Sequence, residues 1–118
     1  MVGVSEAFEI ARSGNKQVAI TLLKQEFQRL QSSDQKVELC DWIASCFQSL
    51  HDYREAAEWY ETAGDLSLSE IGSPLINALS ALKEYEKALG CHEMGDDEEA
   101  LERCLETIEE LHHVYAAA

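Results

Sequence analysis

The chain has 118 residues, of which 23 are acidic and 9 are basic, so its formal net charge is −14. This excess of negative charge repels phosphate groups, which argues against nucleic acids and anionic membrane surfaces as partners. A share of 46% apolar residues is ordinary for a globular domain and argues against a disordered acidic tail. The length fits a single domain, 1–118, and no apolar run approaches the roughly 20 residues of a membrane span.

The four cysteines, at positions 40, 46, 91 and 104, form no Cys-x-x-Cys pair and fall within helical patterns. Residues 1–16 contain two acids and no apolar block, which is unlike a secretory signal peptide. Free, buried thiols in a reducing compartment are therefore expected rather than a disulfide framework, and the predicted location is the cytoplasm.

Hydrophobic residues recur at intervals of three and four along the chain, which is the period of an α-helix. Ser32, Asp52 and Asp96 are each followed three residues later by Gln or Glu, the spacing of a capping box at a helix start. The pattern predicts an all-α chain of six helices, at 3–13, 16–31, 34–50, 52–65, 74–94 and 96–115.

The segment 74–94 admits two interpretations. Ser73 followed by Pro74 is typical of an N-cap and the first residue of a helix, and no helix-breaking residue follows near Lys83. One long helix is therefore favoured over a hairpin broken near that lysine.

Small residues recur at fixed offsets in three copies of one frame, which start at Ala7, Ala44 and Ala88. Alanine on both helices of an antiparallel pair permits close approach, while a larger residue one turn away fills the remaining space. Ala56, in the central copy, is expected at such a crossing. One hairpin cannot bury its own apolar face, so three hairpins are expected to stack, at about 3–31, 34–65 and 74–115.

Residues 37–66, VELCDWIASCFQSLHDYREAAEWYETAGDL, match the 34-residue pattern of the tetratricopeptide repeat without a gap. The chain therefore resembles that family, although its outer copies carry Lys16 and Asp97 where the family has an aromatic residue. The resemblance implies a right-handed helical solenoid of about three antiparallel helix hairpins. The matching core positions are Ile43, Ala44, Phe47, Tyr53, Ala56, Tyr60 and Ala63.

The resemblance also implies a binding face, because family members bind peptides on the concave surface built from the first helix of each hairpin. Members that clamp a carboxy-terminal carboxylate use Lys and Asn where this chain has Asp41 and Ser45. That clamp, and the heat-shock chaperone partner that it implies, are therefore not expected. The residues carried over to this face are Phe8, Asp41, Ser45, Gln48, Tyr85, Leu89 and His92.

Acidic residues concentrate in the second half of the chain, where residues 61–118 carry 14 acids and 3 bases. Negative charge at the start of a helix interacts favourably with the helix dipole, and charges also solvate an outer helix face. The alternative is a docking face for a basic partner, to which Glu102 and Glu106 would contribute.

Two tryptophans, Trp42 and Trp59, lie off the repeated frame. They are expected either to cover a neighbouring hairpin or to mark a partner surface.

The predicted function is a non-catalytic protein-interaction module, a scaffold or adaptor that binds a peptide or helix of a partner, with a basic partner among the candidates. The alternative is a self-associating domain that forms a homo-oligomer through a terminal hairpin. A metal or catalytic protein is a third, less favoured interpretation, because the spacing of the cysteines and histidines fits no zinc pattern. No cofactor, metal ligand or catalytic residue is predicted. The cysteines and histidines that could be considered zinc ligands are Cys91, His92, Cys104, His112 and His113.

Overall fold

The computed structural model describes residues 9–10, 14–69 and 72–117. These residues form an all-α domain without a strand. The first expected helix, 3–13, lies mostly outside the described residues. The helices are α2 (Lys16–Arg29), α3 (Ser33–Ser49), α4 (Tyr53–Leu68), α5 (Pro74–Met94) and α6 (Glu98–Ala117).

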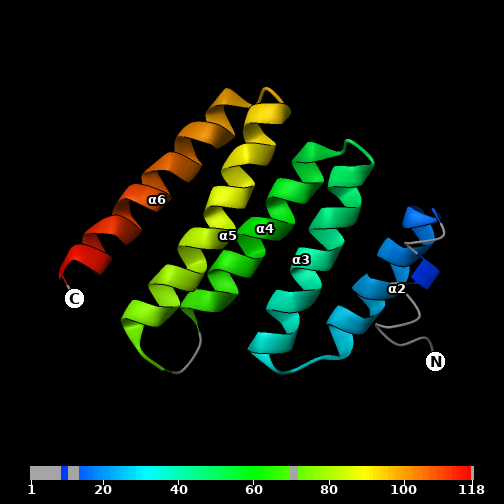
Figure 1. Cartoon of the computed structure of the whole chain (residues 1–118), viewed down its shortest axis with the longest axis horizontal. Coiled ribbons are helices and arrows are strands. Elements are labelled where there is room, and N and C mark those ends of the chain that lie inside the picture. Colours follow the sequence, from blue (N-terminus) through cyan, green and yellow to red (C-terminus); the bar gives the residue numbers. More distant parts are fainter. Residues whose placement is uncertain (1–8, 11–13, 70–71, 118) are drawn as a thin grey trace.

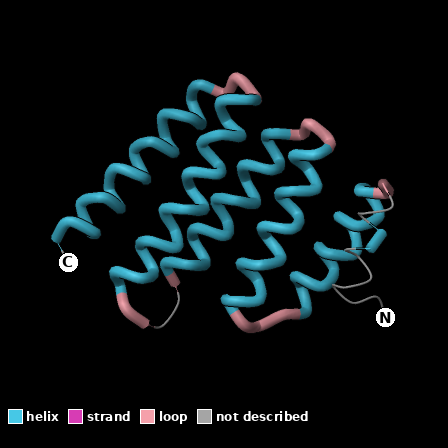
Figure 2. Tube along the Cα trace, viewed as in Figure 1, coloured by secondary structure: helices cyan, strands magenta, loops and turns pink. Residues whose placement is uncertain are grey.

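The helices pack in chain order, each mainly against its neighbours along the sequence, and successive helices run antiparallel (Figure 1). Short connections join most of them (Figure 2). The principal extents are 45 × 34 × 18 Å. A flat row of helices would be only about 5 Å deep at its Cα atoms, whereas the shortest extent of the molecule is 18 Å. The row is therefore staggered, with helices displaced to either side of its mean plane. Side chains accordingly meet across alternate helices, from α2 to α4 and from α3 to α5.

The predicted helix boundaries are largely confirmed. Residues 74–94 form one helix, with the Ser73 side chain accepting from the backbone N–H of Ile76. The helix expected at 52–65 continues to Leu68. The last helix begins later than predicted because Asp97, rather than Asp96, accepts from the N–H of Ala100 and caps it. 

One turn geometry occurs three times, before α2, between α3 and α4, and between α5 and α6. In each copy a residue with positive φ is followed by Asn or Asp, whose side chain caps the next helix and whose N–H closes the preceding turn. The closing N–H···O bonds run from Asn15 to Ile10, from Asp52 to Phe47 and from Asp97 to His92, at 3.2, 2.9 and 3.1 Å. The residues with positive φ are Gly14, His51 and Asp96.

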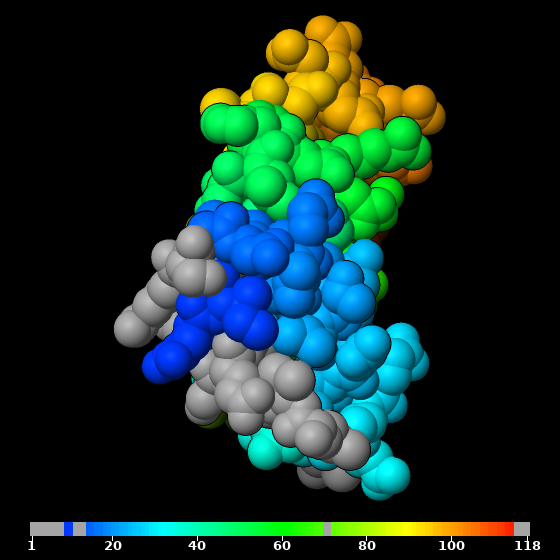
Figure 3. All heavy atoms as spheres, turned by 90° about the vertical axis from the view of Figure 1, so that its right-hand side faces the viewer, coloured from blue at the N-terminus to red at the C-terminus, as the bar shows by residue number. Residues whose placement is uncertain are grey.

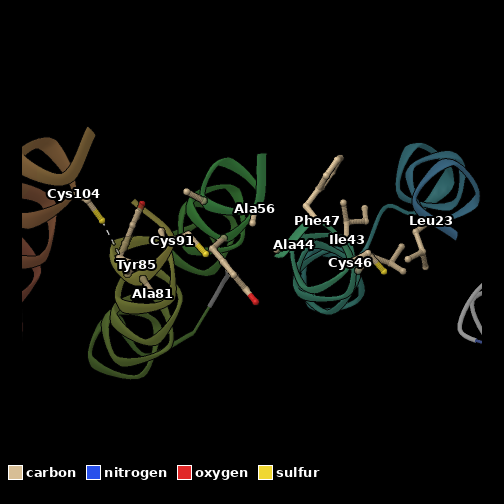
Figure 4. Close-up of a cluster of buried hydrophobic side chains, with 14 of the residues drawn as sticks. Leu23, Ile43, Ala44, Cys46, Phe47, Ala56, Ala81, Tyr85, Cys91 and Cys104 are labelled. Carbon is tan, nitrogen blue, oxygen red and sulfur yellow. Dashed lines mark hydrogen bonds between the residues drawn. The ribbon is translucent and has the colours of Figure 1, made fainter. Parts of the chain in front are cut away.

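Small residues bring the central helices together. Ala44 and Ala56, both 0% exposed, lie between α3 and α4 (Figure 4), in agreement with the predicted close crossing. Between α4 and α5, Gly64 lies so close to the Tyr85 ring that an added Cβ would stand 2.8 Å from ring carbons. Close packing of this kind sets the separation of these helices.

An aromatic contact joins α4 to α2. The Trp59 and Phe27 rings form a T-shaped pair at a centroid distance of 5.4 Å, and Lys24 Nζ lies 5.8 Å from the Trp59 centroid. The prediction that Trp59 covers a neighbouring hairpin is therefore confirmed. In the view onto the α2 end of the row, α2 lies in front and the turn segments of later hairpins rise above it (Figure 3).

Candidate functional site

An open groove of about 340 Å³ runs between α3 and α5, with Tyr60 of α4 between them. We call it the α3–α5 groove. Its lining residues are Glu38, Asp41, Trp42 and Ser45 of α3, Tyr60 of α4 and Lys87 of α5.

The α3 residues share a helix face because they are spaced by three and four positions. Another face of α3 carries Leu39, Ile43 and Cys46, which are buried in the core. Core packing therefore determines which face of α3 is left to line the groove. The Tyr60 hydroxyl donates to Gln48 Oε1 at 3.0 Å, which holds the tyrosine ring in place between the two helices.

A charged cluster links α3 to α5 at this groove. Lys87 Nζ lies 3.7 Å from Asp41 Oδ2 and 3.5 Å from Glu84 Oε1. The same ammonium group stands 5.7 Å from the centroid of the Tyr60 ring. A cation is thus held between two acidic groups and an aromatic face, an arrangement that combines ion pairing with a cation–π contact.

Asp41 and Glu84 form a close pair of acids beside the groove. Glu84 is 6% exposed, and among the described residues its Oε2 and Asp41 Oδ1 are buried without a hydrogen-bond donor. Two ionised carboxylates cannot bond to each other, whereas a protonated Glu84 can donate to Asp41. Burial, together with the hydrogen bond to Asp41 and its negative charge, raises the pKa of Glu84 to about 8. Glu84 therefore keeps its proton to a higher pH than an exposed glutamate does.

The predicted binding residues divide between different parts of the molecule. Asp41 and Ser45 line the groove, and Gln48 adjoins it through Tyr60. Leu89 is half-buried against the core. Glu102 and Glu106 are exposed on α6. Phe8 lies outside the described residues.

Tyr85 and His92 are corrections to the predicted surface, because they are only 4% and 5% exposed. The Tyr85 hydroxyl donates to the carboxylate of Asp65, and His92 Nε2 lies 2.6 Å from Glu61 Oε1. Both partners belong to α4. α5 is therefore rotated so that these two side chains pack on α4 instead of lining an exposed face.

Glu84 and Lys87 were not predicted as site residues. In the sequence they look like ordinary charges at an i, i+3 spacing on a helix. Only the packing of α5 beside α3 brings them to Asp41.

The cysteines lie outside this groove. All four are free and buried, and burial raises the pKa of the Cys40 thiol to about 12 and that of Cys104 to about 11. Cys104 Sγ donates to the Tyr85 carbonyl at 3.3 Å, as Figure 4 shows. Buried thiols with raised pKa are poor nucleophiles, so these side chains serve packing.

A second depression, of about 470 Å³, lies between the α3–α4 turn and the α5–α6 turn. It contains Arg54 and His92 together with several acids, and so presents charges of both signs. In the described part of the chain no three His, Cys, Asp or Glu side chains are grouped so that they could hold a metal ion.

Comparisons with protein-family models, curated proteins and solved structures found no match to this chain. No helix within residues 14–69 and 72–117 is long and apolar enough to cross a membrane.

Proposed function

We propose that the chain is a non-catalytic protein-interaction module that holds a basic segment of a partner protein in the α3–α5 groove. The observation that carries this proposal is the position of Lys87, whose ammonium group lies between Asp41 and the Tyr60 ring. The chain's own lysine demonstrates that a cation fits this combination of acid and aromatic groups. A lysine or arginine of a partner can compete for the same acids.

The walls of the groove suit such a side chain. Trp42 and Tyr60 offer apolar surface to the methylene stem of lysine or arginine, while Glu38 and Asp41 receive its charged end. Because these groups stand on packed helices, little ordering is needed when the partner binds.

The repeated turn and the staggered row of antiparallel helices support a tetratricopeptide-like solenoid. In that architecture the first helices of successive hairpins, here α3 and α5, form the binding face. The buried free thiols suit a reducing compartment such as the cytoplasm.

The test is selection of a displayed random peptide library on the purified full chain, followed by calorimetric titration of the enriched peptides. We expect enriched peptides to share lysine or arginine. Ser45→Lys introduces a positive charge into the groove at an exposed position and should weaken their binding by about tenfold or more.

Ser49→Lys is the matched control, because Ser49 is an exposed serine one turn further along α3 and outside the groove lining. It changes the net charge equally and should leave the affinity nearly unchanged. Enrichment of peptides without basic residues, or equal weakening by both substitutions, would contradict the proposal.

A further inference from the structure

The last helix carries an apolar stripe that is exposed at Leu105 and half-buried at Leu101 and Ile108. Leu101, Leu105 and Ile108 are spaced by four and three residues, so they lie along one side of α6. Leu105 is 47% exposed. The side that faces α5 is different and contains the buried residues Ala100 and Cys104.

The corresponding positions of α4 show what this stripe is suited for. The burial pattern of α6 repeats that of α4 when Ala100 and Cys104 are aligned with Ala56 and Tyr60, since all four residues are buried. In the same register Leu105 corresponds to Glu61, because they come directly after Cys104 and Tyr60 respectively. Glu61 contacts His92 of the next helix, α5.

The other two stripe residues agree with this register. Ile108 corresponds to Gly64, which lies against Tyr85 of α5, and Leu101 corresponds to Ala57, which is fully buried. The Leu101–Leu105–Ile108 stripe therefore occupies the side on which α4 receives its following helix. Within the described residues, α6 has no following helix.

We propose that this stripe binds a helix of a partner protein with an apolar face and basic flanks. Beside the stripe, α6 exposes Glu98, Glu102 and Glu109. Lysine or arginine on the flank of the incoming helix neutralises these carboxylates. A second copy of the same surface would instead place acids opposite acids, in a chain whose net charge is already −14.

The stripe also limits the shape of the partner. Leu101 and Ile108 are larger than Ala57 and Gly64, their equivalents on α4. A helix that approaches α6 as closely as α5 approaches α4 must therefore carry small residues opposite them. The partner face expected is alanine-rich with leucine at the edges, at intervals of three and four residues.

The experiment uses two synthetic amphipathic peptides of about five helical turns, with the same alanine–leucine face and either lysine or glutamate flanks. Binding to the full chain is measured by fluorescence anisotropy, and oligomeric state by light scattering. We expect the lysine peptide to bind and the glutamate peptide not to bind.

Leu105→Glu should weaken binding of the lysine peptide by about tenfold or more, because it places a charge in the apolar contact. Val114→Glu is the matched control: it is 48% exposed, lies on α6 and adds the same charge, but it is off the stripe. Helical circular dichroism establishes that both variants are folded.

Unchanged or tighter binding by Leu105→Glu would show simple attraction to an acidic surface and overturn the proposal, as would equal loss in both variants or no binding of the lysine peptide. A homodimer that Leu105→Glu dissociates would assign the stripe to a second copy instead. Ser45→Lys in the α3–α5 groove should leave binding at α6 unchanged, so failure at one surface is distinguishable from failure at the other.

Discussion

Replacing Glu84 with glutamine should make the protein more resistant to unfolding at alkaline pH. Glu84 is 6% exposed and lies beside Asp41, and its pKa rises from the ordinary 4.5 to about 8 in the folded protein. In the unfolded chain the group is solvated and recovers its ordinary pKa. The folded state therefore holds a proton that the unfolded state releases across this pH window.

The sign and size of the effect follow from proton linkage. Below about pH 4.5 Glu84 is protonated in both the folded and the unfolded state, and its contribution to the free energy of unfolding is fully present. Above that, the free energy of unfolding falls by about 1.4 kcal/mol per pH unit, and the loss is nearly complete once the pH passes the folded pKa. The upper bound on the loss is about 5 kcal/mol, which is a large share of the stability of a small domain. Glutamine cannot ionise, and its amide N–H can donate to Asp41 in place of the carboxyl proton.

Urea unfolding followed by circular dichroism, in steps from about pH 5 to about pH 9, measures this difference. The wild type should lose stability relative to Glu84→Gln as the pH rises. Glu86→Gln is the control, because Glu86 is exposed on the same helix and its substitution removes an equal charge. If the stability of wild type and Glu84→Gln ran parallel across the whole range, the raised pKa of Glu84 would be refuted.

Three further predictions concern packing and backbone, and thermal unfolding measures each of them. Gly64→Ala should destabilise by about 1–3 kcal/mol because its Cβ meets the Tyr85 ring, whereas Gly90→Ala in open space should stabilise by about 0.5–1 kcal/mol. A gain from Gly64→Ala would contradict the close contact. Asp96→Gly should stabilise by about 1 kcal/mol, since φ is 54° there; a loss would mean that the Asp96 side chain matters more than its backbone strain. Ala56→Leu should cost about 1–3 kcal/mol by overpacking, and an unchanged melting temperature would disprove the close crossing.

Local patterns were sufficient to predict the helices and most of their ends. The apolar period is a property of neighbouring residues, and a cap such as Asp52 or Ser73 interacts only with the first turn of its own helix. The sequence does not decide where α6 starts, because Asp96 and Asp97 can both cap a helix. The turn that ends α5 decides it, since it places Asp96 at positive φ and leaves Asp97 as the cap.

The candidate groove could be predicted only in part. Asp41 and Ser45 belong to α3, whose exposed face follows from its own apolar pattern, and both line the groove. The sequence predicts the wrong surface for Tyr85 and His92, because α5 is packed between α4 and α6 and is apolar on more than one side. The rotation of such a helix about its own axis depends on how it packs against both neighbouring helices, and its own apolar pattern does not fix it.

The sequence by itself determined an all-α chain, the extent of α5, and the small residues at which α3 and α4 cross. Short-range periodicity, capping and side-chain volume depend only on residues that are close together in the sequence. Only the tertiary structure decided that Glu84, a charged residue on a helix, is buried beside Asp41 with Lys87 next to both. The physical reason is that the burial of Glu84 and its raised pKa depend on distances between helices, which are set by the packing of the whole row.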